Sequence, residues 1–374
     1  MKRAERRFLS VNFIVTPSLG NAFVRIPEAP IICENSVLKS LLFLFILKRR
    51  SGGGDEVFAH NLLAKTSQLA IVADDGFYAD RRDVALVECW KHGAVTDVSV
   101  LMNGGVVRSS TTPATSVLLN YCMQEAALPG LHINLSEGEP LSTKGSISSL
   151  LEDGTGLFYG KANLRRNLQT VHLWHVEIEI ERQIIKFEKL FGVSPLRVDG
   201  HQHCHVLPGI VEVLCRLLPR HSVSWIRLPE EVVLKQRDSQ MLFSRMNLAG
   251  ESPIDFYREV SSQAAAARVH FQSAGLKSTD AFIGMLTMGQ NMTIDNLQAC
   301  FSVIDRPATV ELMTHPGYPL SGSDWATQGC SARIGPDEFS RSTDRSHEMT
   351  LLRSQEFRNL LKHNNIRLNT FSTF

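Results

Sequence analysis

The chain has 374 residues, of which 43% are hydrophobic, and its 39 Lys and Arg against 38 Asp and Glu give a formal net charge of +1. This length and apolar content allow a sizeable core in one large domain or two ordinary ones. They exclude a chain that is disordered over its whole length. A balanced charge implies no bulk attraction to nucleic acid or to an anionic membrane, so we expect no nucleic-acid partner and argue any partner from a specific site.

The N-terminal segment, residues 1–66, differs in character from the rest. Residues 1–7 carry four basic side chains, and this pattern is compatible with a mitochondrial transit peptide. The apolar run at 41–47 is far shorter than the roughly 20 residues that cross a bilayer, so we expect no stable membrane insertion. Glycines at 52–54 resemble a flexible linker. We therefore predict a poorly ordered or weakly packed extension over 1–66 and a barrel over 67–374.

The seven cysteines are an odd number and include no Cys-x-x-Cys pair. Such a pattern is typical of free thiols in a reduced compartment rather than of a disulfide framework. We therefore expect a cytoplasmic protein.

From about residue 68, short β-rich runs alternate with longer helical periodicities. This alternation predicts a parallel sheet wound with helices, most economically a distorted (β/α) TIM-like barrel of seven or eight parallel strands. The predicted strands are 69–73, 97–101, 131–135, 196–199, 223–227, 281–284, 310–314 and 366–370. The predicted helices are 83–92, 115–126, 172–191, 208–218, 253–271, 294–303 and 348–363.

Polar side chains stand at the ends of several of these strands. Because the carboxyl ends of barrel strands carry the active site, residues far apart in the sequence are expected to converge there. The residues so placed are Asp74 and Asp75 after the first strand, Asn103 after the second, His132 within the third, Asp199 and His201 at the end of the fourth, Arg227 ending the fifth and His315 following the seventh.

Three histidines, His201, His203 and His205, lie within five residues of one another, with Asp199 just upstream. Imidazole and carboxylate groups concentrated in this way are typical of a divalent metal site, although a surface histidine cluster is the alternative. His201 and His205 would share one face of a helix, whereas His201 and His203 would share one face of an extended chain. The sequence alone does not decide which of the three binds a metal.

The adjacent carboxylates of Asp74 and Asp75 could divide two tasks, one ligating a metal and the other acting as a general base toward water. The alternative is a helix cap with one solvated carboxylate. His132 could be a ligand or a hydrogen-bonded core residue. His315 precedes a Pro-Gly turn, where it is suited to be a general acid or is a simple turn histidine. Arg227 could orient a carboxylate, bind substrate oxygens or close the barrel rim with a salt bridge.

Four blocks of the sequence resemble, in the same order, the motif blocks of the YdjC-like carbohydrate deacetylases. The resemblance spans about residues 69–370. The family pattern continues Asp-Asp-Phe-Gly where this chain has Asp74-Asp75-Gly76-Phe77. The blocks are Ala73-Asp74-Asp75, Gly130-Leu131-His132-Ile133-Asn134-Leu135-Ser136-Glu137-Gly138-Glu139-Pro140, Asp199-Gly200-His201-Gln202-His203-Cys204-His205-Val206-Leu207-Pro208 and Glu311-Leu312-Met313-Thr314-His315-Pro316-Gly317-Tyr318.

The resemblance implies a distorted (β/α) barrel and metal-dependent hydrolysis of N-acetyl groups from acetylated sugars such as chitooligosaccharides. Carried over by position, Asp74 would accept the proton and His315 would be the acid. Asp75, His132 and His201 would hold a divalent ion, usually taken as magnesium. Two imidazoles are unusual ligands for magnesium, so zinc, cobalt or manganese stay open. Groups that would bind substrate or hold the ligands in place are Arg227, Asp199, His203 and His205.

Two other functions are compatible with the same residues. One is a different metal-dependent hydrolase, a phosphoesterase or amidohydrolase, on the same barrel. The other is a catalytically impaired sugar-binding homologue, suggested by the reversed order of Gly76 and Phe77. The expected partner is an acetylated oligosaccharide, and the sequence leaves monomer and homodimer open.

The reversal leads to one structural expectation. Glycine tolerates positive φ, and a turn after a metal ligand often needs that freedom, so Phe77 is expected to be strained or to displace Asp75. Exchanging the two residues, Gly76→Phe with Phe77→Gly, is then expected to raise metal affinity or kcat/KM.

Overall fold

The computed structural model describes residues 66–108, 116–236, 246–248, 253–321, 328–331 and 335–374. The predictions made for residues 1–65, including the transit peptide, the apolar run and the linker, lie outside the described residues. No helix in the described ranges is long and apolar enough to span a membrane. The six cysteines within those ranges are free thiols.

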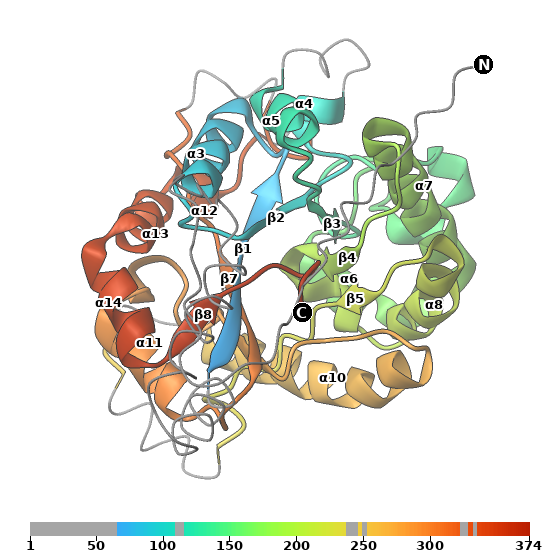
Figure 1. The fold of residues 1–374 in the computed structure, drawn as a ribbon. Helices are drawn as coiled ribbons and strands as arrows, with labels where there is room; N and C mark the ends of the chain where they lie inside the picture. Colours follow the sequence, from blue (N-terminus) through green and yellow to red (C-terminus); the bar gives the residue numbers. More distant parts are fainter. Residues whose placement is uncertain (1–65, 109–115, 237–245, 249–252, 322–327, 332–334) are drawn as a thin grey trace, which may run out of the picture. The chain divides into compact units, whose positions relative to one another are not determined.

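Eight parallel strands form the sheet in the order β5-β4-β3-β2-β1-β7-β6, and β8 pairs with the first residues of β1. β1 ends three residues beyond its predicted range and the other strands lie within two residues of theirs, so the prediction of seven or eight parallel strands is confirmed (Figure 1). The strands are β1 (Ser67–Gly76), β2 (Asp97–Val100), β3 (Gly130–Ile133), β4 (Arg197–Gly200), β5 (Trp225–Ile226), β6 (Ala281–Ile283), β7 (Thr309–Thr314) and β8 (Ile366–Leu368).

The strand β1 lies at the centre of this sheet. Its residues from Leu69 to Ala73 are fully buried. A continuous apolar run of this kind is typical of a parallel strand that is covered on both faces. β1 pairs with β2, β7 and β8, so the polar residues at its end lie in the middle of the fold.

Helices form a ring around the strands (Figure 1). The α-helices are α3 (Asp80–Lys91), α4 (Gly105–Arg108), α5 (Val117–Glu125), α6 (Lys161–Arg166), α7 (Leu173–Phe191), α8 (Ile210–Leu217), α10 (Ile254–Ser273), α11 (Ile294–Ser302), α12 (Glu338–Arg341), α13 (Asp344–Arg353) and α14 (Gln355–His363). Short 3₁₀ helices occupy Lys144–Ser146, Ser148–Leu150, Leu168–Thr170, His201–Val206, Leu218–His221 and Gly289–Asn291.

The single helix predicted over 348–363 is wrong, because the structure has two helices there. α13 ends at Arg353, and Ser354 starts a new helix by accepting a hydrogen bond from the amide of Phe357. An N-cap serine satisfies an otherwise unpaired amide, so the chain can turn at this point without losing hydrogen bonds. The short helices α4, α6 and α12 were not predicted either.

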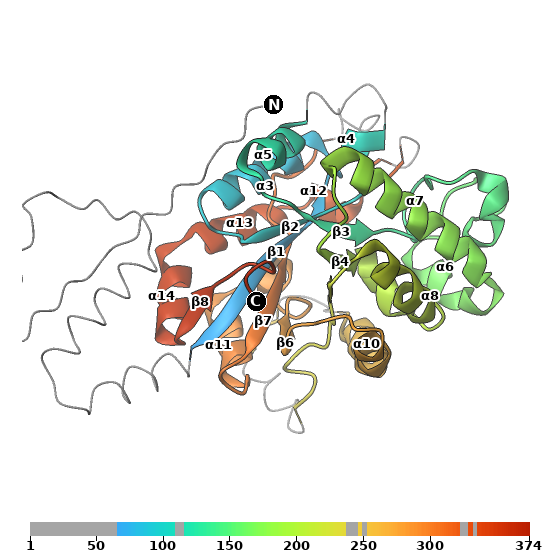
Figure 2. The ribbon, with the colours of Figure 1, turned by 45° about the vertical axis from the view of Figure 1, so that its right-hand side comes forward.

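The barrel is incomplete between β5 and β6. In the described part of the chain only isolated bridges, Trp225 with Lys277 and Glu231 with Phe282, join the two ends of the sheet. The buried carboxylate of Glu231 reinforces this seam by accepting hydrogen bonds from the amides of residues 284–286 at 2.8–3.4 Å. Figure 2 shows the strands curving from β4 through β1 to β6. The predicted distorted barrel is thus confirmed.

Candidate active site and metal centre

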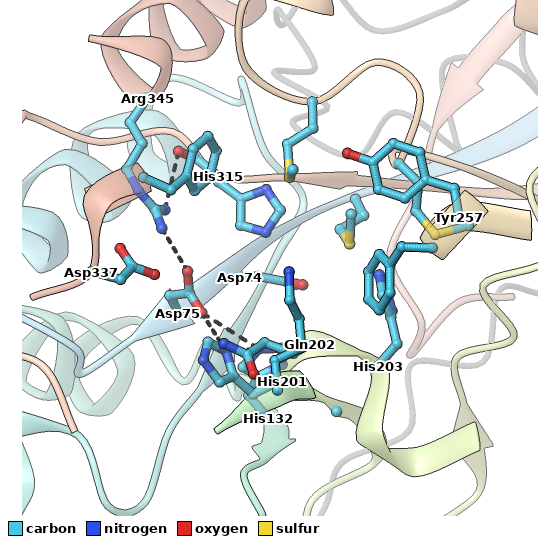
Figure 3. Close-up of a pocket in the computed structure, with 17 residues that line it drawn as sticks. Asp74, Asp75, His132, His201, Gln202, His203, Tyr257, His315, Asp337 and Arg345 are labelled. Atoms are coloured by element: carbon cyan, nitrogen blue, oxygen red, sulfur yellow. Dashed lines mark hydrogen bonds and ion pairs between the residues drawn. The ribbon is translucent and has the colours of Figure 1, made fainter. Parts of the chain in front are cut away.

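One pocket opens at the carboxyl ends of β1, β3, β4 and β7 (Figure 3). Of the residues predicted to converge, Asn103, Asp199 and Arg227 do not line this pocket, and the others do. Its lining residues are Asp74, Asp75, His132, Lys161, Gly200, His201, Gln202, His203, Phe256, Tyr257, Met285, Met288, Met313, His315, Asp337, Phe339 and Arg345.

An irregularity at the end of β1 brings two consecutive carboxylates into this pocket. Ala73 pairs with Val98 but Gly76 with Val100, so β1 has one residue more than β2 over this stretch. Consecutive side chains of a regular strand point to opposite faces, and a bulge changes that alternation. Asp75 completes the turn with a φ of 66°, in the left-handed region. Both Asp74 and Asp75 therefore line the pocket, and they have different partners.

The two oxygens of Asp75 face opposite ways. Oδ1 lies 3.1 Å from Nδ1 of His201 and 3.5 Å from Nε2 of His132. Oδ2 accepts hydrogen bonds from Arg345 at 2.9 Å and from Arg82 at 3.3 Å. These hydrogen bonds with the histidines and the charge of Arg345 outweigh burial and hold the pKa of Asp75 well below its usual range. The carboxylate is thus charged, with one oxygen directed at the imidazoles.

The three inward atoms are spaced as ligands of one small cation would be. Nδ1 of His201 and Nε2 of His132 are 3.3 Å apart, so the three separations run from 3.1 to 3.5 Å. Ligands at about 2.0–2.1 Å from a common ion are separated by about 3.0 Å at octahedral corners and about 3.4 Å at tetrahedral ones. One oxygen and two nitrogens suit zinc or cobalt better than magnesium, which prefers oxygen ligands. The residues present therefore fit a divalent ion.

Each of the two imidazoles is held by a second carboxylate through its far nitrogen. Nδ1 of His132 lies 2.6 Å from Asp199, and Nε2 of His201 lies 2.8 Å from Glu137. Burial alone would lower both pKa values, but Asp199 raises the pKa of His132 to about 9, and the hydrogen bonds to Asp75 and Glu137 raise that of His201 to about 10. Without a metal both rings are protonated at neutral pH, so a metal must displace two protons.

Arg227 connects the remaining buried carboxylates. Its Nη1 and Nη2 lie 2.6 and 2.8 Å from the two oxygens of Asp74, its Nη2 is 3.0 Å from Asp199, and its Nε is 2.7 Å from Glu311. Asp74, His132 and Asp199 form a second candidate group of ligands, but both of its carboxylates are already bound by the guanidinium of Arg227. Arg227 therefore orients Asp74, one of the roles open for it in the sequence.

The histidine run after β4 follows neither a helical nor an extended spacing. Gln202 and His203 both adopt left-handed φ values, 52° and 59°, so the three rings diverge. His203 lines the pocket, whereas His205 lies outside it, with Nε2 3.1 Å from the carbonyl of Arg227. Burial lowers the pKa of His205 to about 3, so the ring is neutral and donates this hydrogen bond. A Cβ on Gly200 would stand 2.6 Å from Nδ1 of His205, which explains the glycine.

His315 follows β7 and points into the pocket, on the side opposite His132 and His201 in Figure 3. Its backbone amide donates to the buried carboxylate of Glu348. Burial lowers the pKa of the imidazole to about 4, so the ring is neutral at pH 7. Its Nδ1 is buried and has no hydrogen-bond partner among the described residues.

Sequence reasoning did not identify several residues that shape this site. Glu137 lies in the second motif block, three residues beyond Asn134, and a carboxylate at that position is a signal for a histidine partner. No local signal marks Arg345, which is 270 residues away from Asp75. The other missed residues are Arg82, Lys161, Phe256, Tyr257, Phe339, Asp337 and the three methionines of the pocket.

A parallel barrel with a polar pocket at the carboxyl ends of its strands is the architecture of (β/α)-barrel enzymes. The model of the family described as YdjC-like protein matches residues 68–363, and the chain belongs to this family.

Similar proteins include a carbohydrate deacetylase from Xenopus laevis, 34% identical over 321 residues that cover 82% of this chain and 97% of the relative. A chitooligosaccharide deacetylase from Serratia marcescens is 31% identical over 144 residues, 38% of this chain and 52% of the relative. The crystal structure of an Enterococcus faecalis protein, provisionally named as a cellobiose-phosphate cleavage protein, is similar with a TM-score of 0.58. It is 17% identical over 82% of this chain and 98% of the other, which shows a shared fold.

Proposed function

We propose that the protein is a metal-dependent carbohydrate deacetylase that hydrolyses N-acetyl groups of acetylated oligosaccharides of the chitooligosaccharide kind. The observation that carries the proposal is the set of three inward atoms, from Asp75, His132 and His201, beside the oriented carboxylate of Asp74. The names of the relatives support the same activity and the same class of substrate.

In this proposal Asp75, His132 and His201 hold a divalent ion: magnesium is the ion that the family resemblance implies, and zinc, cobalt and manganese are the alternatives that the two imidazoles favour. Such an ion supplies Lewis acidity, which polarises the acetamide carbonyl and lowers the pKa of a nearby water. Asp74 takes the proton of that water as it attacks, because Arg227 fixes the carboxylate in one orientation. The carbon–nitrogen bond then breaks, giving acetate and a free amine.

His315 delivers a proton to the departing nitrogen from the opposite side of the pocket. Because the free imidazole is neutral at pH 7, it has to acquire that proton during the reaction. Asp74, which has just taken a proton from water, is the available source. The negative charges of Asp75 and Asp74 favour the protonated form of the His315 ring. The proton of the water thus leaves on the product amine, and the residues return to their starting charges.

The walls of the pocket are compatible with a sugar. The aromatic rings of Phe256 and Phe339 are half-buried at its edge, and aromatic faces pack against the apolar faces of sugar rings. Lys161, Asp337 and Arg345 add charged groups that can bond hydroxyls. The Gly76-Phe77 order leaves Oδ1 of Asp75 within 3.1–3.5 Å of both imidazoles, which favours an active enzyme over an impaired sugar-binding homologue.

Acetate release from N,N′-diacetylchitobiose tests the proposal. Protein stripped with EDTA should be inactive, and the addition of Mg²⁺, Mn²⁺, Co²⁺ or Zn²⁺ should restore turnover. Hydrolysis of a phosphate ester instead would assign a phosphoesterase, and sugar binding without turnover would assign a binding protein. Full deacetylation by metal-free protein would rule out the mechanism.

A further inference from the structure

Glu137, in the loop after β3, is held by several hydrogen bonds although the residue is only partly buried. The amide of Glu137 donates to Oδ1 of Asn134 at 2.9 Å, and its carbonyl accepts from Nδ2 of Asn134 at 2.9 Å and from Nδ2 of Asn103 at 3.3 Å. Nδ2 of Asn134 also contacts Oδ1 of Asn103 at 3.2 Å. Two buried amide side chains therefore clamp the backbone of Glu137 before its own side chain makes any contact.

Both oxygens of the Glu137 side chain are engaged. Oε2 lies 2.8 Å from Nε2 of His201, and Oε1 accepts a hydrogen bond from the hydroxyl of Tyr78 at 2.9 Å. Burial, and then the charge of Glu137, raise the pKa of Tyr78 far above its usual value, so this phenol stays a donor. The same hydroxyl accepts the amide of Asp337 at 2.9 Å. Glu137 thus connects a proposed metal ligand to the pocket wall.

The need for such a group follows from how His201 would bind. His132 directs Nε2 at the site, but His201 directs Nδ1, so its Nε2 must carry the proton when Nδ1 is a ligand. Rotation of the His201 ring by half a turn would put a carbon where Nδ1 now lies. The hydrogen bond from Nε2 to Glu137 opposes that rotation and fixes the tautomer.

We infer that Glu137 is a positioning residue that holds the His201 ring with Nδ1 directed at the metal site, and that Tyr78 fixes the angle of its carboxylate. The inference rests on the proposed function only in assuming that His201 is a ligand. Asp199 serves His132 in the same way, at 2.6 Å, so each imidazole has its own carboxylate.

The test is the affinity of the full-length, EDTA-stripped protein for Mn²⁺, measured by titration calorimetry. Glu137→Ala should weaken binding by about 10–100-fold, the usual loss when a group that orients a ligand is removed. Glu137→Gln, whose amide oxygen can still accept from Nε2, should lose only a few-fold. The matched control is Glu139→Gln, two residues on and lining no part of the pocket, which should bind as the unchanged protein does.

If Glu137 only stabilised the fold, its replacement would lower the melting temperature but would leave the affinity for Mn²⁺ unchanged. We expect metal-free Glu137→Ala to melt below the unchanged protein, because His201 and Tyr78 each lose a partner, and in addition to gain less stability from added Mn²⁺. Should the alanine variant fail to fold, Glu137→Asp carries the test, because its shorter side chain cannot reach both Tyr78 and His201.

Unchanged Mn²⁺ affinity in the alanine variant, or in the aspartate variant where alanine does not fold, overturns the inference. Failure of the proposed function looks different. If the unchanged protein binds Mn²⁺ and the variants weaken it, yet no acetate is released from the sugar, the inference stands and the deacetylase activity is wrong. If the unchanged protein binds no Mn²⁺ or other divalent ion, both are wrong.

Discussion

Arg227 spans the interior of the barrel to bind both oxygens of Asp74, with Nη1 2.6 Å from Oδ2 and Nη2 2.8 Å from Oδ1. The planar guanidinium matches a carboxylate in this two-bonded way, which an ammonium group does not. The same cation contacts Asp199 and Glu311, so one fully buried charge serves three buried carboxylates. Asp74 is therefore held in a single orientation. A general base needs such a fixed orientation because it has to accept a proton from one particular water.

Two replacements of Arg227 should separate its effect on the orientation of Asp74 from the effect of its positive charge. Arg227→Lys keeps a cation but loses the fork, so we expect kcat to fall by about tenfold or more while Mn²⁺ affinity changes little. Arg227→Met leaves Asp74 buried without its cation, whereas Asp199 and Glu311 keep contacts with Arg197, and it should reduce the free energy of unfolding by about 3–5 kcal/mol. Urea unfolding and metal titration measure the two effects. A lysine variant with unchanged kcat would show that the orientation of Asp74 is unimportant.

The two adjacent aspartates should give different phenotypes. Asp74→Asn should keep metal affinity within a few-fold but lose about 10²-fold or more in kcat, the usual scale for a general base. Some stability should be lost as well, because the new amide nitrogen faces the guanidinium of Arg227. Asp75→Asn should weaken metal binding itself, since it removes the only anionic group among the three proposed ligands. Equal metal affinities in both variants would contradict these roles.

Metal affinity should depend steeply on pH. His132 and His201, with pKa values of about 9 and about 10 in the metal-free protein, must each lose a proton before binding. Affinity should therefore rise with pH by up to about tenfold per unit for each proton released, and level off above about pH 10. Calorimetry in buffers of different ionisation enthalpy counts the protons. Release of no protons at pH 7 would show that the rings are neutral before the metal arrives.

The stability of the metal-free protein should change with pH in the opposite direction. Both histidines have raised pKa values, so their contribution is fully present below the unfolded value of about 6.5 and is lost as pH rises through about 9 to 10. The melting temperature without metal should fall over that window, whereas saturating metal should flatten the change. A metal-free melting temperature that rises from pH 7 to 9 would contradict the assignment.

The positions and the ends of the strands could be predicted from the sequence because each depends on a short local pattern. Asp74, Asp75, His132, His201 and His315 were placed in this way, and all line one pocket. Their roles stay predictions that the proposed experiments test.

The partners of these residues could not be predicted, because they depend on distant contacts and on local backbone twists. Arg345 reaches Asp75 from α13, across 270 residues, and nothing near it in the sequence marks that contact. The run from His201 to His205 bends through two left-handed residues, which no helical or extended spacing describes. The gap between β5 and β6 is likewise bridged by the Glu231 carboxylate, which accepts hydrogen bonds from amides some 50 residues away.

The reversed Gly76-Phe77 pair has a structural reason. Phe77 does adopt a φ of 65°, as expected, but it is fully buried, its ring stacks on that of Phe191 and its amide donates to Asp83 at 2.8 Å. A Cβ at Gly76 would lie 2.8 Å from Cγ1 of Val100. Glycine is therefore needed at 76 for space, not for positive φ.

Exchanging the two residues should therefore impair the protein, because the close approach of Val100 at Gly76 opposes the gain expected from the sequence. Gly76→Ala alone should cost about 1–3 kcal/mol by overpacking, and a phenylalanine there more. Phe77→Gly relieves about 1–2 kcal/mol of left-handed strain but removes a buried aromatic ring worth about 3–5 kcal/mol. Urea unfolding and Mn²⁺ titration should show the exchanged protein less stable and weaker in metal binding, because Asp75 precedes the disturbed turn. An exchanged protein of equal stability and tighter metal binding would show that the loop repacks around the new ring.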